Sequence, residues 1–375
     1  MGYYEYVATC LFGLEKFLGD EIEALGYKKL ETTDGRITFA GDEDAMARFN
    51  IFSRYAERLY IKLGEFKAET FTELFDGTKD LPFECFIDKN DCFPVTGSSI
   101  KSKLTSIPDC QSIIKKAIVE KLKESYHVNW FEESGTLYKI EFFISHNIAT
   151  IMIDTSGAPL HKRGYRPDSN AAPLRETLAA AMVKIARLRE DVLLWDPFCG
   201  SGTIAIEAAM LMTDTAPGLN RSFAAEQFEF LDEDIWKRAH EEAKDKIKKD
   251  CKFEVYASDI DDKCVSLTKA NAKRAGVIDN IKSFKKDARD ITTKGRRGTI
   301  VCNPPYGERM MSSKSVEKLY TDMGRSFSKL DNWQIYIISS VNDFEALYGK
   351  KADKTRKLYN GRLKCSYYQY FKNKK

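Results

Sequence analysis

The sequence predicts an α/β protein in which a doubly wound, mostly parallel sheet follows one or two smaller α+β units. Three observations predict this fold class. Short apolar runs alternate with helical stretches after residue 190, strands and helices mix without that order before residue 155, and a hairpin signal lies near the end. The 375 residues are enough for two or three domains.

Two amphipathic helices and several strands are expected in the first half. A helix over 11–25 carries apolar residues at helical spacing from Leu14 to Leu25, and a second helix over 110–123 does the same. Such a mixture of strands and helices is typical of small α+β units. The expected strands are 3–9, 36–40, 59–64, 137–144 and 148–154.

A domain boundary is expected near residues 155–172, which are rich in glycine, proline, small polar residues and positive charge. Strand–helix alternation after it predicts a parallel doubly wound sheet. The expected strands are 193–198, 254–260, 282–288, 299–305 and 334–340. The expected helices are 203–212, 232–249, 262–275 and 315–329.

The last segment, residues 350–375, is basic and contains a predicted hairpin. It holds ten lysines or arginines and one acid, Asp353, together with several aromatic residues. Asn360-Gly361 between two β-prone runs is a strong hairpin signal and would add antiparallel strands to the sheet edge. On charge alone, this segment could be either a solvated terminal hairpin or a contact for nucleic acid, and both interpretations remain open.

The composition indicates an ordinary globular chain, with 43% hydrophobic and 31% charged residues. No apolar run is long enough for a membrane span, and the N-terminus lacks the pattern of a secretory signal. The nine scattered cysteines contain no C-x-x-C pair, which argues against a disulfide framework and a zinc site and favours the reducing cytoplasm. A net charge of +3 neither requires nor excludes a nucleic-acid partner.

A loop with the sequence D-P-F-C-G-S-G-T follows the first strand of the second half. It opens a helix at the carboxyl end of the sheet, where doubly wound folds bind their ligands. Its glycines would let the backbone turn tightly and approach a ligand without a Cβ in the way. A G-x-G pair alone would favour an ordinary turn, but the strand-end aspartate and the Pro-Phe-Cys after it favour a ligand site. The residues assigned to the ligand are Asp196, Pro197, Phe198, Gly200, Gly202 and Thr203.

Acids also end the next two strands. Asp259, followed by Ile260, is placed to accept hydrogen bonds from both ribose hydroxyls of a nucleoside cofactor. Asp261 has the alternative role of capping the helix that follows. Asp287, which precedes Ala288, could accept from an adenine amino group.

The strongest chemical signal is Asn303-Pro304-Pro305-Tyr306 at the end of the fourth strand. An exocyclic amine on a base is a poor nucleophile because its lone pair is delocalised into the ring. The Asn303 side-chain oxygen and the Pro304 carbonyl could accept its two N–H groups and free the lone pair, and the prolines stiffen the loop. Tyr306 offers a face on which an extruded base can stack. With a sulfonium methyl donor, alignment supplies much of the rate and no metal is needed.

These elements, in this order and spacing, resemble the class I S-adenosylmethionine-dependent methyltransferases that modify amino groups of nucleobases. Adenine-N6 and guanine-N2 enzymes of that class share N-P-P-Y, so the motif implies the type of atom and not the base. The resemblance implies S-adenosyl-L-methionine as the cofactor. It adds Leu174, Thr177 and Asn303 to the cofactor-binding residues named above.

Further segments narrow the resemblance to RNA guanine-N2 methyltransferases. Residues 160–166 (LHKRGYR) and 172–177 (APLRET) resemble the segment ahead of their catalytic domain. Residues 216–223 (APGLNRSF), with Trp236 after them, resemble an insertion of the same group. The first half resembles a ferredoxin-like domain followed by a THUMP domain, most clearly over 94–119.

The resemblance covers nearly the whole chain and implies three domains. These are a ferredoxin-like domain at 1–58, a THUMP RNA-binding domain at 59–156 and a Rossmann-like methyltransferase domain with a C-terminal antiparallel hairpin at 157–375. Some members of the family carry a second methyltransferase domain, which this chain is expected to lack.

The resemblance implies RNA as the partner and guanine N2 of 23S rRNA as the expected target. Lysines of the THUMP domain and cations on the approach to the active site are expected to contact the RNA backbone. They are Lys101, Lys103, Lys115, Lys116, Lys162, Arg163 and Arg166.

Three alternatives remain open. They are a tRNA guanine-N2 methyltransferase, a DNA adenine-N6 methyltransferase, and an RNA-binding assembly factor with a vestigial cofactor pocket. The intact Asn303 and glycine loop argue against the assembly factor, and a DNA enzyme would not be expected to carry a THUMP domain. A nicotinamide dehydrogenase is disfavoured because the loop lacks the third glycine of G-x-G-x-x-G.

Overall fold

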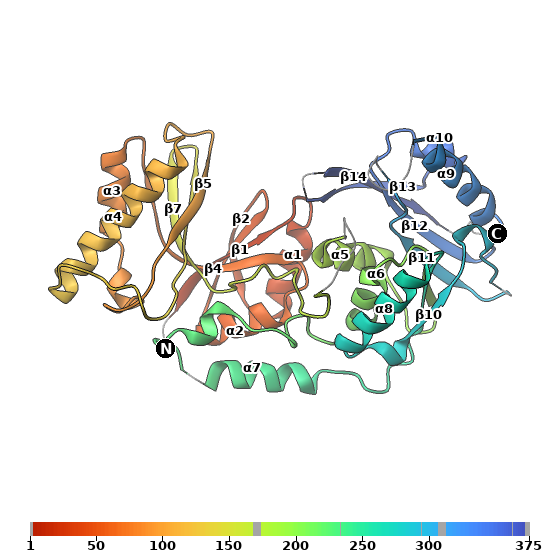
Figure 1. Ribbon diagram of the computed structural model, residues 1–375, viewed down its shortest axis with the longest axis horizontal. Helices are drawn as coiled ribbons and strands as arrows, with labels where there is room; N and C mark the ends of the chain where they lie inside the picture. Colours follow the sequence, from red (N-terminus) through yellow and green to blue (C-terminus); the bar gives the residue numbers. More distant parts are fainter. Residues whose placement is uncertain are drawn as a thin grey trace.

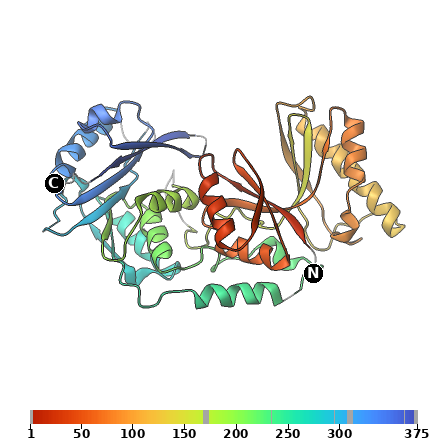
Figure 2. The same cartoon turned by 180° about the vertical axis from the view of Figure 1, so that it is seen from behind.

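The computed structural model describes residues 3–167, 174–232, 234–293, 295–306, 313–361 and 363–371. Two seven-stranded sheets organise these residues. The sheets lie at opposite ends of an elongated molecule, and helices α1 and α2 of the first half lie between them (Figures 1 and 2). In the described part of the chain, no helix combines the length and apolar composition needed to cross a membrane.

The first sheet has the order β2-β3-β1-β4-β7-β6-β5. Its strands are β1 (Tyr4–Cys10), β2 (Lys28–Thr33), β3 (Arg36–Gly41), β4 (Ala56–Lys67), β5 (Val95–Ile100), β6 (Ile140–Ser145) and β7 (Ile148–Asp154). Its helices are α1 (Glu15–Ala24), α2 (Glu43–Phe52), α3 (Phe71–Lys79) and α4 (Ile107–Tyr126). Local chemistry sets two helix starts, because Asp42 caps α2 and a Thr70–Glu73 capping box opens α3.

Strand β4 belongs to both parts of this sheet. Residues 56–61 pair with β1, and residues 60–67 pair with β7. The sheet therefore continues without a break from the ferredoxin-like part into the THUMP part. The division expected after residue 58 falls within this strand and stays a prediction.

The second sheet has the order β10-β9-β8-β11-β12-β14-β13. Its strands are β8 (Leu193–Asp196), β9 (Val255–Asp259), β10 (Ile281–Lys285), β11 (Gly298–Cys302), β12 (Trp333–Ser339), β13 (Lys354–Asn360) and β14 (Leu363–Tyr370). Its helices are α5 (Glu176–Ala186), α6 (Thr203–Met212), α7 (Asp234–Asp245), α8 (Asp262–Arg274), α9 (Ser313–Phe327) and α10 (Phe344–Tyr348). Strands β8 to β12 are parallel, and β14 runs antiparallel to β12.

Alternate residues of these strands enter two separate hydrophobic cores. Leu194 and Val301 pack in the cluster that contains α5 and α6, whereas Leu193 and Ile300 pack in the cluster that contains α9 and α10. Helices thus cover both faces of the sheet, and its order reverses between β8 and β11. The predicted doubly wound fold with a C-terminal hairpin is confirmed.

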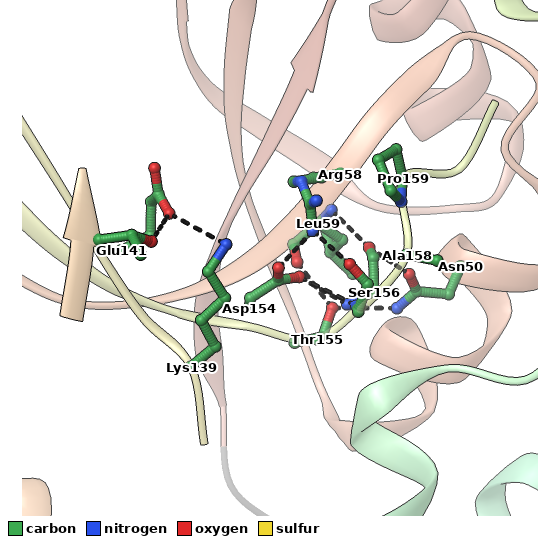
Figure 3. Close-up of polar contacts among 12 residues, drawn as sticks. Asn50, Arg58, Leu59, Lys139, Glu141, Asp154, Thr155, Ser156, Ala158 and Pro159 are labelled. Carbon is green, nitrogen blue, oxygen red and sulfur yellow. Dashed lines mark hydrogen bonds and ion pairs between the residues drawn. The ribbon is translucent and has the colours of Figure 1, made fainter. Parts of the chain in front are cut away.

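The segment that leaves β7 is fixed by polar contacts to the first half of the chain (Figure 3). The Arg58 guanidinium pairs with Asp154 and donates to the Gly157 carbonyl. Asn50 donates to the Thr155 hydroxyl at 3.0 Å and accepts from the Ser156 hydroxyl at 2.7 Å. The start of the expected boundary segment is therefore a packed joint rather than a loose linker.

Helix α7 adds a second connection between the two halves. It packs along α2 (Figure 1). Arg48 of α2 holds Glu242 of α7 through two hydrogen bonds of 2.8 and 3.0 Å. Just ahead of α7, the Phe228 ring stacks on Tyr138 with 4.5 Å between centroids. The insertion between α6 and β9 therefore contacts both parts of the first sheet.

Candidate active site

The predicted chemical residues meet at the carboxyl edge of the second sheet. Strand β8 pairs with β9 on one side and with β11 on the other. Asp196 ends β8, Asp259 ends β9, and Asn303 follows β11 directly. The three residues thus leave neighbouring parallel strands at one edge, where the strand order reverses and doubly wound folds bind ligands.

The glycine-rich loop folds over the end of β9. The Gly200 N–H donates to the Asp259 carboxylate at 3.0 Å, and the Cys199 N–H donates to the Ser258 carbonyl at 3.0 Å. Gly202 has a φ of +85°, and a Cβ there would lie 2.8 Å from Cγ2 of Thr268. Only glycine fits this position without strain and a clash.

Asp259 and Ile260 form a surface that fits a nucleoside. The Asp259 carboxylate accepts from the Gly200 and Asp261 N–H groups, which fixes its direction. Ile260 is 62% exposed, so its side chain is accessible to an aromatic ring. Asp261 caps α8 by accepting from the Lys263 N–H at 2.9 Å, as its alternative role required.

Asp196 is fully buried beneath the same loop. Among the described residues, the one hydrogen-bond donor to its carboxyl group is the Phe198 N–H, at 3.1 Å. Burial raises the pKa of Asp196 to about 8, and the negative charge of Asp259 adds to the shift. A buried carboxyl group with so few donors suits a cationic ligand group, such as the ammonium of an amino-acid cofactor.

Asp287 takes part in an ion pair. The Arg289 guanidinium bonds both carboxylate oxygens, at 2.9 and 2.5 Å, and this pairing lowers the pKa of Asp287. Ala288 is buried beside it. Contact between Asp287 and an adenine amino group stays a prediction, and it requires the carboxylate to be shared with Arg289.

The loop after β11 is held at two points. The Tyr320 hydroxyl of α9 donates to the Pro305 carbonyl at 3.0 Å, and the Asn360 amide donates to the Tyr306 hydroxyl at 3.2 Å. Pro304 is buried between these contacts.

Within this anchored loop, one acceptor is left open. The side-chain oxygen of Asn303 is buried and has no hydrogen-bond partner among the described residues. Leaving a buried acceptor unpaired costs roughly 1–3 kcal/mol, so a ligand N–H that reached this oxygen would be bound favourably. The unpaired oxygen, the glycine at 202 and the exposed Ile260 together fit a nucleoside cofactor beside an amine substrate.

The role expected for Arg163 is wrong. Its side chain is only 2% exposed. Its guanidinium donates to the carbonyls of Ser53, Leu160 and Arg54, which ties the joint to the first half of the chain. A side chain in this position cannot reach an RNA phosphate.

The role expected for Arg166 is wrong for a similar reason. Its guanidinium forms a buried ion pair with Glu176 at 2.9 Å and donates to the Thr203 hydroxyl at 2.6 Å. It also donates to the carbonyl of the buried Leu174 at 3.1 Å. Arg166 therefore supports the glycine loop from behind. The resemblance of residues 160–166 to the family suggested RNA contact, but it gave no indication that the Arg166 side chain is buried.

Thr177 was assigned to the cofactor, but its hydroxyl is already bound to the first sheet. It donates to Glu57 of β4 at 2.6 Å, and Glu57 also binds His161 and Arg175. The side chain of Thr177 is thus not free for a cofactor. No local sequence signal marks Glu57, because its partners are more than 100 residues away. Ala172 and Pro173 lie outside the described residues.

The lysines expected to bind RNA have different surroundings. Lys101, Lys116 and Lys162 are exposed. Lys103 is also exposed and pairs with Glu69. Lys115 is half-buried over the Phe93 ring and pairs with Glu133 at 2.6 Å, and burial lowers the pKa of its ammonium. Lys115 is therefore the least accessible of the five, and RNA contact by all of them stays a prediction.

Three family models match successive parts of the chain. The RlmL ferredoxin-like domain matches residues 5–60, and the THUMP domain matches residues 68–154. The RMKL-like methyltransferase domain matches residues 163–369, which is more than half of the chain.

Two named relatives align over nearly the whole chain. The putative RNA methyltransferase YpsC of Bacillus subtilis (strain 168) is 46% identical, over 98% of this chain and 96% of that protein. The ribosomal RNA large subunit methyltransferase K/L of Psychromonas ingrahamii is 31% identical over 94% of this chain. This chain spans only 48% of that second relative.

Solved structures also match over the full length. A possible methylase from Clostridium difficile 630 has a TM-score of 0.96 and 45% identity, covering 100% of this chain and 99% of that one. A predicted N6-adenine-specific DNA methylase from Listeria monocytogenes has a TM-score of 0.94 and 42% identity, covering 100% and 97%. SMU.472, a putative methyltransferase complexed with SAH, has a TM-score of 0.94 and 38% identity, covering 100% of both chains.

The domain matches and the relatives agree with the site at the edge of the second sheet. The resemblance to THUMP-containing class I methyltransferases is confirmed. The chain belongs to the RMKL-like methyltransferase family, with an RlmL ferredoxin-like domain and a THUMP domain ahead of the methyltransferase domain.

Proposed function

We propose that this methyltransferase uses S-adenosyl-L-methionine to methylate guanine N2 in 23S rRNA. The observation that carries the proposal is the buried Asn303 oxygen, which has no partner among the described residues and lies at the sheet edge that also carries the glycine-rich loop. An acceptor at this place suits a substrate that brings N–H groups, as an exocyclic amine does. The nine free cysteines are in keeping with a reaction in the cytoplasm.

RNA as the substrate is supported by the THUMP domain and by the two named relatives, which are called RNA and ribosomal RNA methyltransferases. The Listeria protein is called a predicted N6-adenine-specific DNA methylase, which keeps DNA as a competing substrate. The base and the RNA class therefore have to be read from the methylated product.

The residues that would hold the cofactor are those at the ends of β8 and β9. Asp196 would bind the ammonium, Asp259 the ribose hydroxyls, and Ile260 one face of the adenine ring. When bound, S-adenosyl-L-methionine supplies a methyl group on a positively charged sulfur.

The chain's own contribution is to orient the amine. The Asn303 oxygen accepts one N–H of the substrate amine, and the Pro304 carbonyl accepts the other. These acceptors are fixed before the substrate arrives, because Tyr320 and Asn360 anchor the loop that carries them. Tyr306 stacks on the extruded base, and its hydroxyl bond to Asn360 sets the ring direction.

The test is to identify the methylated nucleoside. Purified protein would be incubated with isotopically labelled S-adenosyl-L-methionine and, in turn, unmodified 23S rRNA, unmodified tRNA and unmethylated genomic DNA. Mass spectrometry of the digested nucleosides should give N2-methylguanosine from 23S rRNA. The same product from tRNA alone would contradict 23S rRNA as the substrate. N6-methyladenine from DNA would contradict both RNA as the substrate and guanine as the methylated base.

A further inference from the structure

The tip of the β13–β14 hairpin projects past the edge that carries the active site. Ser339 ends β12 and pairs with Ser366, so residues 359–361 and 363–364 of the hairpin lie beyond the end of β12. The Asn360 amide reaches Tyr306 of the substrate loop at 3.2 Å. The tip therefore stands beside the place where the target base enters.

The two faces of the hairpin differ in chemistry. Leu358 and Cys365 are paired across the strands and buried in the core. On the other face, Tyr359 pairs with Lys364, and Lys357 lies two residues away on the same strand. The Lys357 ammonium lies 5.3 Å from the centroid of the Tyr359 ring. This face is aromatic and basic.

A turn from the N-terminal end of the chain completes this surface. Phe12 is 57% exposed, and its ring meets the Tyr359 ring edge-on with 6.2 Å between centroids. Arg356 of the hairpin donates to the Gly13 carbonyl at 2.9 Å and lies over the Phe17 ring. Two segments from opposite ends of the sequence thus share one surface.

The hairpin supplies the positive charge of this surface. Lys357 and Lys364 are exposed, and neither forms an ion pair with a residue in the described ranges. Strands β13 and β14 contain no aspartate or glutamate. Two acids lie near Phe12: Glu15 accepts from the Gly13 and Gly35 N–H groups, and Asp34 precedes Gly35, which lies against the Phe12 ring. An occupant with negative charge and flat rings would complement these side chains.

We propose that Phe12, Lys357, Tyr359 and Lys364, here called the tip surface, bind the single-stranded nucleotides next to the target base. Bases stack on the two rings, and the lysines pair with phosphates, as in other proteins that hold single strands. This RNA contact would give the basic residues of the hairpin a function. The other tyrosines of the hairpin (Tyr367, Tyr368 and Tyr370) are buried and not available for stacking. This inference rests on the proposed function, because it takes RNA as the substrate.

The test compares two double variants of the full chain, Phe12→Ala/Tyr359→Ala and Lys357→Ala/Lys364→Ala. Filter binding to an unmodified 23S rRNA transcript would be measured over a series of salt concentrations. Loss of the rings should raise Kd about tenfold or more at every salt concentration. Loss of the lysines should raise Kd and lower the slope of log Kd against log salt by about two.

Two controls separate RNA contact from loss of structure. Phe371→Ala removes an exposed ring at the far end of β14 and should leave Kd unchanged. Tyr359→Phe keeps the ring, and no described residue bonds its hydroxyl, so RNA binding should stay normal. In the Ala variants, KM for RNA should rise while the Kd for S-adenosyl-L-methionine stays constant.

Wild-type Kd values for RNA in both double variants would contradict the proposal that the tip surface binds RNA. An equal loss in Phe371→Ala would also overturn it, because hairpin stability would then be the cause. The wild-type transfer reaction reports separately on the proposed function. If that reaction fails on RNA while the variants still weaken RNA binding, the proposed function fails and the tip surface stands.

Discussion

The two loops at the carboxyl edge of the second sheet are built in opposite ways. In the 196–203 loop, the polar backbone groups are tied to Asp259, Thr268 and Asn271. In the 303–306 loop, the backbone is anchored, but the Asn303 oxygen has no partner among the described residues. On the proposed assignment, the cofactor loop is fully formed in the free protein, whereas the substrate loop keeps a side-chain acceptor open for the amine.

The largest effect is expected from Arg166, which supports the cofactor loop. Arg166→Met leaves Glu176 buried without its partner, which should lower the free energy of unfolding by about 3–5 kcal/mol. Burial already raises the pKa of Glu176. At acid pH the carboxyl group is therefore protonated and uncharged, and the variant loses less of its free energy of unfolding. The loss should therefore grow as pH rises above that pKa, as followed by urea denaturation.

The double variant Arg166→Met/Glu176→Gln is the matched control for this prediction. It removes the unpaired charge and should recover much of the lost stability. If it is as unstable as the single variant at every pH, the ion pair is not what supports the loop.

A smaller effect is expected at Gly202, where shape decides. Gly202→Ala forces a side chain into the left-handed region, at about 1–2 kcal/mol, and adds a clash with Thr268. Gly276→Ala has a φ of +74° and no atom within 4 Å of the added Cβ, so it measures the backbone strain alone. Calorimetry should find weaker S-adenosyl-L-methionine binding in Gly202→Ala only. Equal affinity in the two variants would refute a tight cofactor loop.

The pH dependence of cofactor binding tests Asp196. Its pKa of about 8 means that the carboxyl group is mostly protonated at pH 7 in the free protein. An ammonium ligand favours the ionised form, so binding should release a proton. Affinity should rise by up to about tenfold per pH unit below 8 and level off above it. Asp196→Asn should bind weakly with no such slope, and a slope that persists there would assign the proton to another group.

The smallest effect is expected at the hydroxyl of Tyr306. Tyr306→Phe removes one hydrogen bond to Asn360, worth about 1 kcal/mol, and keeps the ring. Turnover should fall only a few-fold, whereas Tyr306→Ala should lose more because the stacking face is gone. Comparable losses in the two variants would mean that the hydroxyl and not the ring carries the function.

The sequence predicted the features that depend on local order. Asp196 ends one buried strand and Asn303 directly follows its parallel neighbour, so their meeting at one edge follows from parallel pairing. The motif residues expected at strand ends proved to be loop residues, as at 197–198 and 303–305. Helix α5, which is buried almost all round, was not among the predicted helices. Strand β5 was missed because V-T-G-S-S-I lacks alternating apolar residues.

The sequence could not predict features that depend on distant partners. Arg163 and Arg166 look like surface cations in the sequence, yet the first donates to carbonyls of residues 53 and 54 and the second pairs with Glu176. Glu57 gathers three donors from beyond residue 160 without any local signal. Whether a charged side chain is exposed or paired depends on the folded structure and cannot be read from the sequence. Basic residues near a motif are therefore weak evidence for RNA contact.

Single-turnover methyl transfer by Asn303→Ala tests the central claim most directly. The unmodified 23S rRNA transcript would be the substrate, and calorimetry would measure S-adenosyl-L-methionine binding by the same protein. Loss of one preoriented acceptor predicts a rate about 10²–10³-fold lower, with a cofactor Kd near that of the wild type. A rate within a few-fold of the wild type would contradict the claim that the open oxygen on the substrate loop activates the amine.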